Sequence, residues 1–113
     1  MIKIKDIMAS TTWYSDQNFL VVKIETDFPE YYGVGCTALK TGGHEHVSVF
    51  TSDVRPALIG CSISEAKSVA SYVQRYDAVS RVVLGVVNLA LWNLLSKLEK
   101  KNAFEALAYR QFM

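Results

Sequence analysis

The chain has 113 residues, of which 50% are hydrophobic and 20% charged, and its formal net charge is +1. This length predicts a single domain over residues 1–113, and the composition excludes a disordered chain. Because the charge shows no basic excess or stripe, we expect no nucleic-acid partner.

Neither a signal peptide nor a membrane span is predicted. Charged residues separate the apolar ones in the N-terminal MIKIKDI, which leaves no uninterrupted apolar region. The most apolar stretch, Val82 to Leu95, is shorter than the about 20 residues that a span needs, and Asn88 and Asn93 interrupt it. Cys36 and Cys61 form no C-x-x-C pair, so we expect buried, reduced thiols and a cytoplasmic location.

The first third of the chain alternates apolar and polar residues, the pattern of half-buried strands. It predicts an antiparallel meander of three strands: residues 2–13, 19–26 and 31–37. A polar loop over residues 10–18 joins the first two strands, and Pro29 marks a turn at 27–30 before the third. Gly33 and Gly35 predict a bulge or the close approach of a neighbouring backbone.

Helical periodicity follows a glycine-containing loop over residues 38–46. A first helix is predicted over residues 46–59, with Pro56 bending or tightening its last turn and Gly60 as the left-handed residue just past its end. Ser62 and Glu65 have the capping-box spacing, so a second helix is expected to begin there.

The longest stretch without a helix breaker, residues 79–98, predicts a core helix that is packed nearly all round. Arg81, Asn88 and Trp92 share one column of this helix, which is either a partly solvated stripe or a surface that faces another domain. The helix is expected to end at Asn102, before a short helical piece over residues 103–108. The predicted class is therefore α+β, a three-stranded antiparallel meander followed by a bundle of three to four helices.

Five short segments are informative through the identity of their residues as well as through their periodicity. They are IKIKDI at 2–7, VVKIETD at 21–27, YGVG at 32–35, VRPALIG at 54–60 and VNLALWN at 87–93. In this order they resemble the N-terminal capping domain of the mandelate racemase and muconate lactonizing branch of the enolase superfamily, and YYGVGCTAL is most similar to acid-sugar dehydratases. Asn88 and Asn93 stand where the family has aspartates.

The resemblance implies a partner for this domain, a catalytic (β/α) barrel that the 113 residues are expected to lack. In the family, barrel carboxylates hold Mg²⁺ and a barrel lysine or histidine removes the proton alpha to a carboxylate. We therefore expect no catalytic residue, metal site or cofactor in this chain, which should be inactive alone. An acid-sugar substrate, for a dehydratase or a racemase, is expected only in an assembled enzyme.

The alternative is a stand-alone interaction module that associates with a second copy of itself and has no catalytic activity. Tyr109, Phe112 and Met113 are apolar residues near the end of the sequence, and we expect them to dock or self-associate.

In the family, two loops of the capping domain close over the substrate, and they correspond to residues 10–18 and 38–46. The candidate substrate contacts are Trp13, Tyr14, Lys40 and His44. A structural role for the two aromatic residues and a solvated position for Lys40 are the alternatives.

The sequence His44-Glu45-His46 is the nearest approach to a metal cluster. Two histidines two residues apart share a metal only from a strand, and no cysteine or carboxylate partner is predicted close by. We expect the three residues to flank a helix start, with Glu45 near the positive end of the helix dipole.

Overall fold

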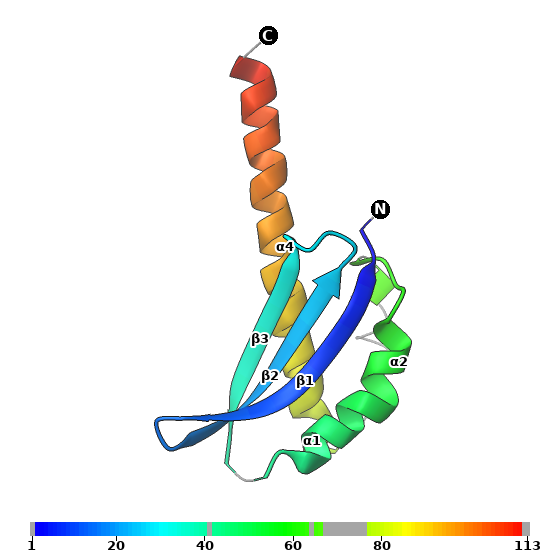
Figure 1. Ribbon diagram of the computed structural model, residues 1–113, viewed down its shortest axis with the longest axis vertical. Helices are drawn as coiled ribbons and strands as arrows, with labels where there is room; N and C mark the ends of the chain where they lie inside the picture. Colours follow the sequence, from blue (N-terminus) through cyan, green and yellow to red (C-terminus); the bar gives the residue numbers. More distant parts are fainter. Residues whose placement is uncertain (1, 41, 64, 67–76, 112–113) are drawn as a thin grey trace.

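The structure is a computed structural model that describes residues 2–40, 42–63, 65–66 and 77–111, with backbone alone from residue 100 onward. An antiparallel sheet in the order β1-β2-β3 forms one layer, and the long helix α4 lies behind it (Figure 1). The strands are β1 (Ile4–Tyr14), β2 (Gln17–Thr26) and β3 (Tyr32–Leu39). The other helical elements, which run along the β1 side, are α1 (His44–Val49), a π-helical turn (Phe50–Val54) and α2 (Arg55–Leu58). The predicted α+β class is confirmed.

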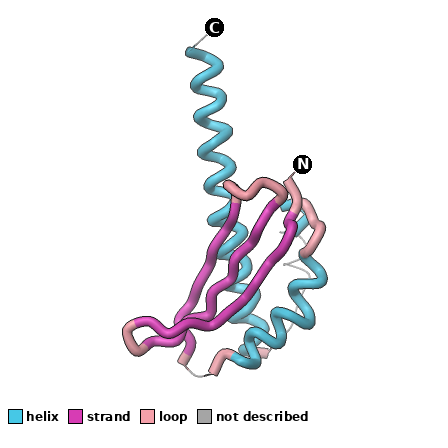
Figure 2. The backbone as a smooth tube through the Cα atoms, viewed as in Figure 1, coloured by secondary structure: helices cyan, strands magenta, loops and turns pink. Residues whose placement is uncertain are grey.

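The predicted loop over residues 10–18 is wrong over most of its length, because these residues continue the two strands. Tyr14 pairs with Gln17, so Ser15 and Asp16 alone form the turn, with φ values of 48° and 61°. Two consecutive positive φ values are typical of a type I′ turn, whose twist matches that of the strands it joins. The result is a long hairpin that projects beyond the rest of the sheet (Figure 2). The second predicted loop is also shorter than expected, since β3 continues to Leu39 and α1 begins at His44.

The close backbone approach predicted at Gly33 and Gly35 is confirmed, and the neighbour is α4 (Ala78–Gln111). A Cβ atom added to Gly35 would lie 2.5 Å from the carbonyl oxygen of Val86 and 2.8 Å from the amide nitrogen of Ala90. At Gly33 it would meet the carbonyl oxygen of Ala90. The helix therefore packs directly on the backbone of β3.

The core lies between the sheet and one face of α4. Its largest fully buried side chains come from β1, β2, the helical segment before Gly60 and a stripe of α4, namely Ile4, Ile7, Leu20, Val22, Ile24, Phe50, Leu58, Val83, Val86, Val87, Leu91 and Leu94. The prediction that this helix is packed nearly all round is wrong, because Leu89 and Trp92 are 53% and 59% exposed. Arg81 and Asn88, from the predicted column, are exposed as well.

Helix α4 is longer than predicted. It passes through Asn102 without a break and reaches Gln111, so the expected end at Asn102 and the separate helical piece are wrong. Its C-terminal half extends beyond the sheet (Figure 1). The side chains of the apolar tail lie outside the described residues. By length and composition alone, Ala78–Glu99 would suffice to cross a membrane, so the rejection of a span stays a prediction.

The helical segment before Gly60 contains a π-turn ahead of Pro56. The backbone N–H of Arg55 donates to the carbonyl of Phe50, five residues earlier. Proline has no N–H to donate, and its ring would collide with the carbonyl of the preceding turn, here Ser52. The segment therefore widens before Pro56, whereas we predicted a bend or a tighter last turn. Gly60 has a φ of 85°, as expected for the residue just past a helix end.

The predicted capping box is confirmed. The backbone N–H of Glu65 donates to Ser62 Oγ at 3.3 Å, and the backbone N–H of Ser62 donates to Glu65 Oε2 at 3.4 Å. Most of the second predicted helix lies outside the described residues.

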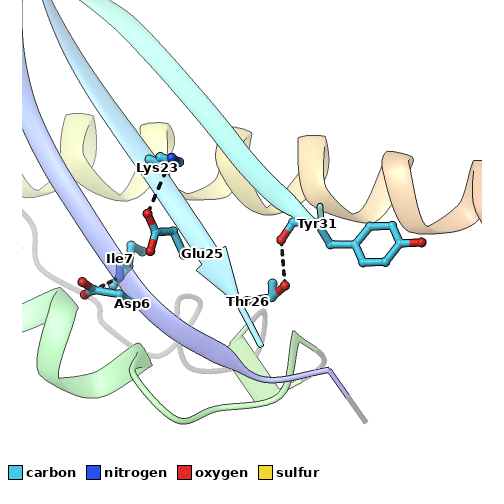
Figure 3. Close-up of polar contacts among 6 residues, drawn as sticks. All are labelled: Asp6, Ile7, Lys23, Glu25, Thr26 and Tyr31. Carbon is cyan, nitrogen blue, oxygen red and sulfur yellow. Dashed lines mark hydrogen bonds and ion pairs between the residues drawn. The ribbon is translucent and has the colours of Figure 1, made fainter. Parts of the chain in front are cut away.

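Polar contacts connect the sheet edge and the turns (Figure 3). The register of β1 and β2 shifts between Ile4 and Asp6, and Asp6 Oδ1 accepts the backbone N–H of Ile7 at 2.8 Å. The guanidinium of Arg55 also donates to Asp6 Oδ1, at 3.0 Å, which joins α2 to β1. Thr26 Oγ1 bonds the carbonyl of Tyr31 at 2.7 Å and so closes the turn between β2 and β3.

Both described cysteines are free thiols. Cys36 is exposed on the outer face of β3, so its predicted burial is wrong, and Cys61 is partly buried. The wrong prediction has a simple cause: alternation along β3 places Gly35 against α4 and turns its neighbour to the opposite face.

Candidate functional site

The two segments that were expected to contact substrate lie at the same end of the sheet. In a meander the chain leaves β1 and β3 at the same end of the sheet, so the Ser15-Asp16 turn lies at the same end as Lys40, Gly42 and Gly43. In Figure 1 both lie at the lower end of the sheet, with the hairpin projecting to one side.

Trp13 and Tyr14 lie at the tip of the hairpin and are 71% and 75% exposed. Successive strand residues point to opposite faces, so these two rings cannot both turn toward the same ligand. Trp13 shares its side of β1 with Thr11, which lies against Gly43. The topology therefore places Trp13, rather than Tyr14, on the side of the second segment.

The second segment carries Lys40 and His44, and both are exposed. Lys40 directly follows β3, and His44 is the first residue of α1. Glu45 lies in the first turn of this helix, as expected for an acidic residue near the positive end of the dipole. His46 is half-buried, and no hydrogen bond reaches its buried Nδ1 from the described residues. His44, Glu45 and His46 therefore form the first turn of α1, whereas we predicted a loop that flanks the helix start.

An open hollow of about 470 Å³ adjoins His44, between α1 and the start of α4. Its described lining consists of His44, Glu45, Ser48, Val49, Asp77 and Val79. Within the described ranges, no three histidine, cysteine or carboxylate side chains gather closely enough to hold a metal ion.

Two residues that the sequence did not single out join these segments. Gln17 Nε2 donates to the carbonyl of Leu39 at 2.9 Å, and Asn18 Nδ2 donates to the carbonyl of Gly42. Asn18 is only 4% exposed. A signal for it was present in the sequence, since Asn18 continues the alternation of Leu20 and the later inward residues of β2 and is a polar residue on the buried face.

Glycine is required where the second segment meets the hairpin. Gly43 is buried with a φ of 130°, and a Cβ atom there would lie 2.5 Å from Thr11 Cγ2. The backbone conformation and the available space therefore both disfavour any other residue at this position.

The segments at this end of the sheet thus carry an exposed indole, an exposed ammonium group and an exposed imidazole. These groups can shield a bound molecule, pair with a carboxylate and bond hydroxyl groups. Their placement suits recognition of a polar anionic molecule.

No protein-family model matches the chain. Over 101 residues the chain is 31% identical to a D-galactonate dehydratase family member of Enterococcus gallinarum, covering 84% of this chain and 25% of that protein. An enolase from Pantoea ananatis, solved with bound D-gluconate and Mg, matches with a TM-score of 0.78 and 25% identity over 88% of this chain and 25% of its own. A mandelate racemase/muconate lactonizing protein from Paracoccus denitrificans has the same fold, with a TM-score of 0.78 and 21% identity over 87% of this chain and 28% of its own. The chain is an enolase-type N-terminal domain of this branch.

The domain spans about a quarter of the length of the relatives it matches. The resemblance found in the sequence is confirmed, and the structure explains which residues carried it. The segments containing Asp6 and Arg55 meet in an ion pair, and the segment containing Gly35 packs on α4. In the last segment, Asn93 Oδ1 accepts the backbone N–H of Val34 at 3.0 Å, a bond that an aspartate would also accept. The recognisable residues of the domain are therefore those that hold its elements together.

Proposed function

We propose that this domain is the substrate-specificity domain of an acid-sugar dehydratase, or of a racemase, of the mandelate racemase and muconate lactonizing branch. The observation that carries the proposal is the convergence of the hairpin tip and residues 40–44 at one end of a domain whose relatives include a D-galactonate dehydratase family member. In this role the two segments close over the far end of an acid sugar that is bound in a separate (β/α) barrel.

The proposed contacts follow from the chemistry of an acid sugar, which combines a carboxylate with a chain of hydroxyl groups. The ammonium of Lys40 pairs with anionic oxygen, the imidazole of His44 bonds a hydroxyl or the carboxylate, and the indole of Trp13 covers the C–H face and excludes water. Tyr14 points to the opposite side of the strand and contributes less.

The proton transfer and the loss of hydroxide belong to the barrel in this proposal. Carboxylates of the barrel would hold Mg²⁺, and the ion would supply charge stabilisation for the reacting carboxylate group of the substrate. The described residues of this domain do not assemble a metal site, so we assign them binding and the exclusion of water.

The exposed stripe of α4 supplies the surface for the barrel. Leu89 and Trp92 are large apolar side chains of this helix, three residues apart, and both are more than half exposed. Large exposed apolar groups that lie together mark protein interfaces. The free thiols of Cys36 and Cys61 suit a reducing compartment, so we place the assembled enzyme in the cytoplasm.

A chimera tests this function. The domain replaces the N-terminal quarter of the Enterococcus gallinarum relative, and the product is assayed with Mg²⁺ and a panel of acid sugars. We expect the chimera to form a 2-keto-3-deoxy acid from at least one of them and the 113-residue chain alone to form none. In the chimera, Trp13→Ala raises KM about tenfold, and Tyr14→Ala, the matched control on the opposite face, changes it less than twofold, which corresponds to contact energies of about 1.4 and below 0.4 kcal/mol.

Two results would contradict the proposal. Turnover by the 113-residue chain alone would remove the need for a barrel, and a folded chimera that is inactive on every acid sugar would remove the substrate class. The DNA downstream of the codon for Met113 offers an independent test, since it should encode a barrel with its carboxylate ligands, in frame or just out of frame.

A second copy of this chain is the alternative partner for the stripe of Leu89 and Trp92. Size-exclusion chromatography with light scattering separates the two possibilities. A dimer at micromolar concentration that Trp92→Glu converts to a monomer favours self-association, and a monomer at high micromolar concentration favours the barrel.

A further inference from the structure

The hairpin tip and the segment after β3 are held together by side chains of two adjacent residues of β2. Gln17 Nε2 donates to the carbonyl of Leu39 at 2.9 Å and lies 3.1 Å from the carbonyl of Asn18. Asn18 donates to the carbonyl of Gly42 from a position that is 4% exposed. The contacts span 22 and 24 residues of sequence, and they extend the pairing of β2 with β3 from Leu39 to Gly42.

The backbone ladder already orients Trp13, because Trp13 pairs with Asn18 and Asn18 pairs with Leu39. The residues that follow Leu39 are less constrained. Lys40, Gly42 and Gly43 have no strand partner among the described residues, and both glycines have positive φ. The position of this segment relative to the hairpin therefore depends on side-chain contacts.

Both carbonyl groups that accept these bonds flank Lys40 in the segment that leads to His44, and the donors, in β2, lie four and five residues after Trp13. Thr11 also lies against Gly43, which adds an apolar contact between the hairpin and the same segment. The junction is thus a three-point attachment at the base of the surface that bears the candidate substrate contacts.

We propose that Gln17 and Asn18 are positioning residues, which hold Trp13 in a fixed place relative to Lys40 and His44 so that the two segments meet an acid sugar as one surface. This inference rests on the proposed function for its substrate, but the attachment itself is a property of the 113-residue chain. Without the two donors, the segment after Leu39 moves relative to Trp13, which stays in the sheet. Substrate binding must then supply the free energy that orders this segment.

Gln17→Glu tests the attachment with almost no change in shape. At neutral pH the introduced carboxylate has no proton to donate to the carbonyl of Leu39, whereas the protonated acid has one. In a ¹⁵N,¹³C-labelled chain we expect the carbonyl ¹³C resonance of Leu39 to shift at pH 7 and to return toward the wild-type position as the introduced group is protonated. Because the bond forms only with the protonated acid, this group titrates above the usual glutamate pKa of about 4.3.

Backbone dynamics provide the second measurement. We expect order parameters of Gly42 and Gly43 near about 0.85 in the wild type and below about 0.6 in Gln17→Glu at pH 7. The indole ¹⁵N of Trp13, distinguished from the other tryptophan in a Trp92→Phe background, should show no such loss of order, because Trp13 stays in the sheet.

Asn18→Ala removes the buried donor and is expected to loosen Gly42 by the same measure. Asn88→Ala, at an exposed asparagine of α4, is the matched control and should leave every resonance of the junction unchanged. If Asn18→Ala does not fold, the more exposed Gln17→Glu variant still decides the question.

Unchanged Leu39 and Gly43 resonances and order parameters in Gln17→Glu between pH 7 and pH 4 would overturn the inference. An inactive chimera would contradict the proposed function and leave these spectra unaffected, so the two failures are distinguishable. In an active chimera, Gln17→Glu should raise KM about fivefold to tenfold with little change in kcat, as expected when one hydrogen bond that orders a binding surface is lost.

Discussion

Two regions of this domain differ in what their residues do. One is the contact between β3 and α4, and the other is the end of the sheet that bears the hairpin tip. At the first, Gly35 brings two backbones together, and the helix residues whose backbone it approaches, Val86 and Ala90, are aliphatic and buried. At the second, aromatic, ammonium and imidazole groups are exposed, and the buried contacts are two side-chain amides bonded to carbonyls. The comparison teaches that the stability of this domain and its candidate chemistry reside in separate places, so each can be altered without the other.

The largest effect is expected from Gly35→Ala. The added methyl group would lie 2.5 Å and 2.8 Å from backbone atoms of Val86 and Ala90, which cannot rotate away, so α4 must move off the sheet. We expect a loss of about 4 kcal/mol of unfolding free energy, measured by urea denaturation.

Gly85→Ala is the matched control for that substitution. Gly85 is exposed within α4, and a Cβ atom there meets nothing within 4 Å. Alanine should stabilise the helix by about 0.5 to 1 kcal/mol. Equal effects of the two alanines would show that the close packing of β3 on α4 does not matter.

Leu94→Ala should cause the next largest loss of unfolding free energy. Leu94 is fully buried in the core beside Gly33, and its truncation leaves a cavity between helix and sheet. The expected loss is about 3 kcal/mol. If Leu94→Ala lost less unfolding free energy than Asn93→Ala, the assignment of Leu94 to the core would be contradicted.

Asn93→Ala is expected to cost about 1 kcal/mol, because the backbone N–H of Val34 loses its acceptor at the outer edge of β3. Asn93→Asp keeps an acceptor oxygen in the same place and should be close to neutral. If the aspartate variant were as unstable as the alanine variant, the hydrogen bond would not be the reason for a carboxamide here.

The smallest effect on stability is expected at the hairpin tip. Trp13→Ala and Tyr14→Ala remove side chains that are at least 71% exposed, so each should change the unfolding free energy by less than about 0.5 kcal/mol. Together with a raised KM for Trp13→Ala in the chimera, this would confirm the separation of stability and binding. A large loss of stability from Trp13→Ala would instead indicate that the indole is part of the structure.

Local features of the fold were predictable because their causes are local. Alternation along β2 predicted its buried face, Gly60 predicted a positive φ, and Ser62 with Glu65 predicted reciprocal capping. The turn at Ser15 and Asp16 was missed because its polar neighbours resemble a loop, and strand pairing overrides that local appearance. The π-turn was missed because several widths of helix accommodate Pro56, and the sequence does not select among them.

The candidate site was predictable in position and unpredictable in its connections. The family resemblance placed Trp13, Tyr14, Lys40 and His44 in two loops, and the topology of the meander brings these loops to one end. The hydrogen bonds of Gln17 and Asn18 could not be derived, since they depend on where β3 ends and how the following glycines turn.

By itself, the sequence determined the order of strands and helices, the buried face of β2 and the family resemblance, because these follow from periodicity and from residues in fixed local order. The tertiary structure alone decided that α4 leaves Leu89 and Trp92 exposed, that Trp13 and Tyr14 face opposite ways at the hairpin tip, and that Gln17 reaches Leu39. Each of these depends on which surfaces meet after the chain has folded, and contacts between residues far apart in sequence set those surfaces.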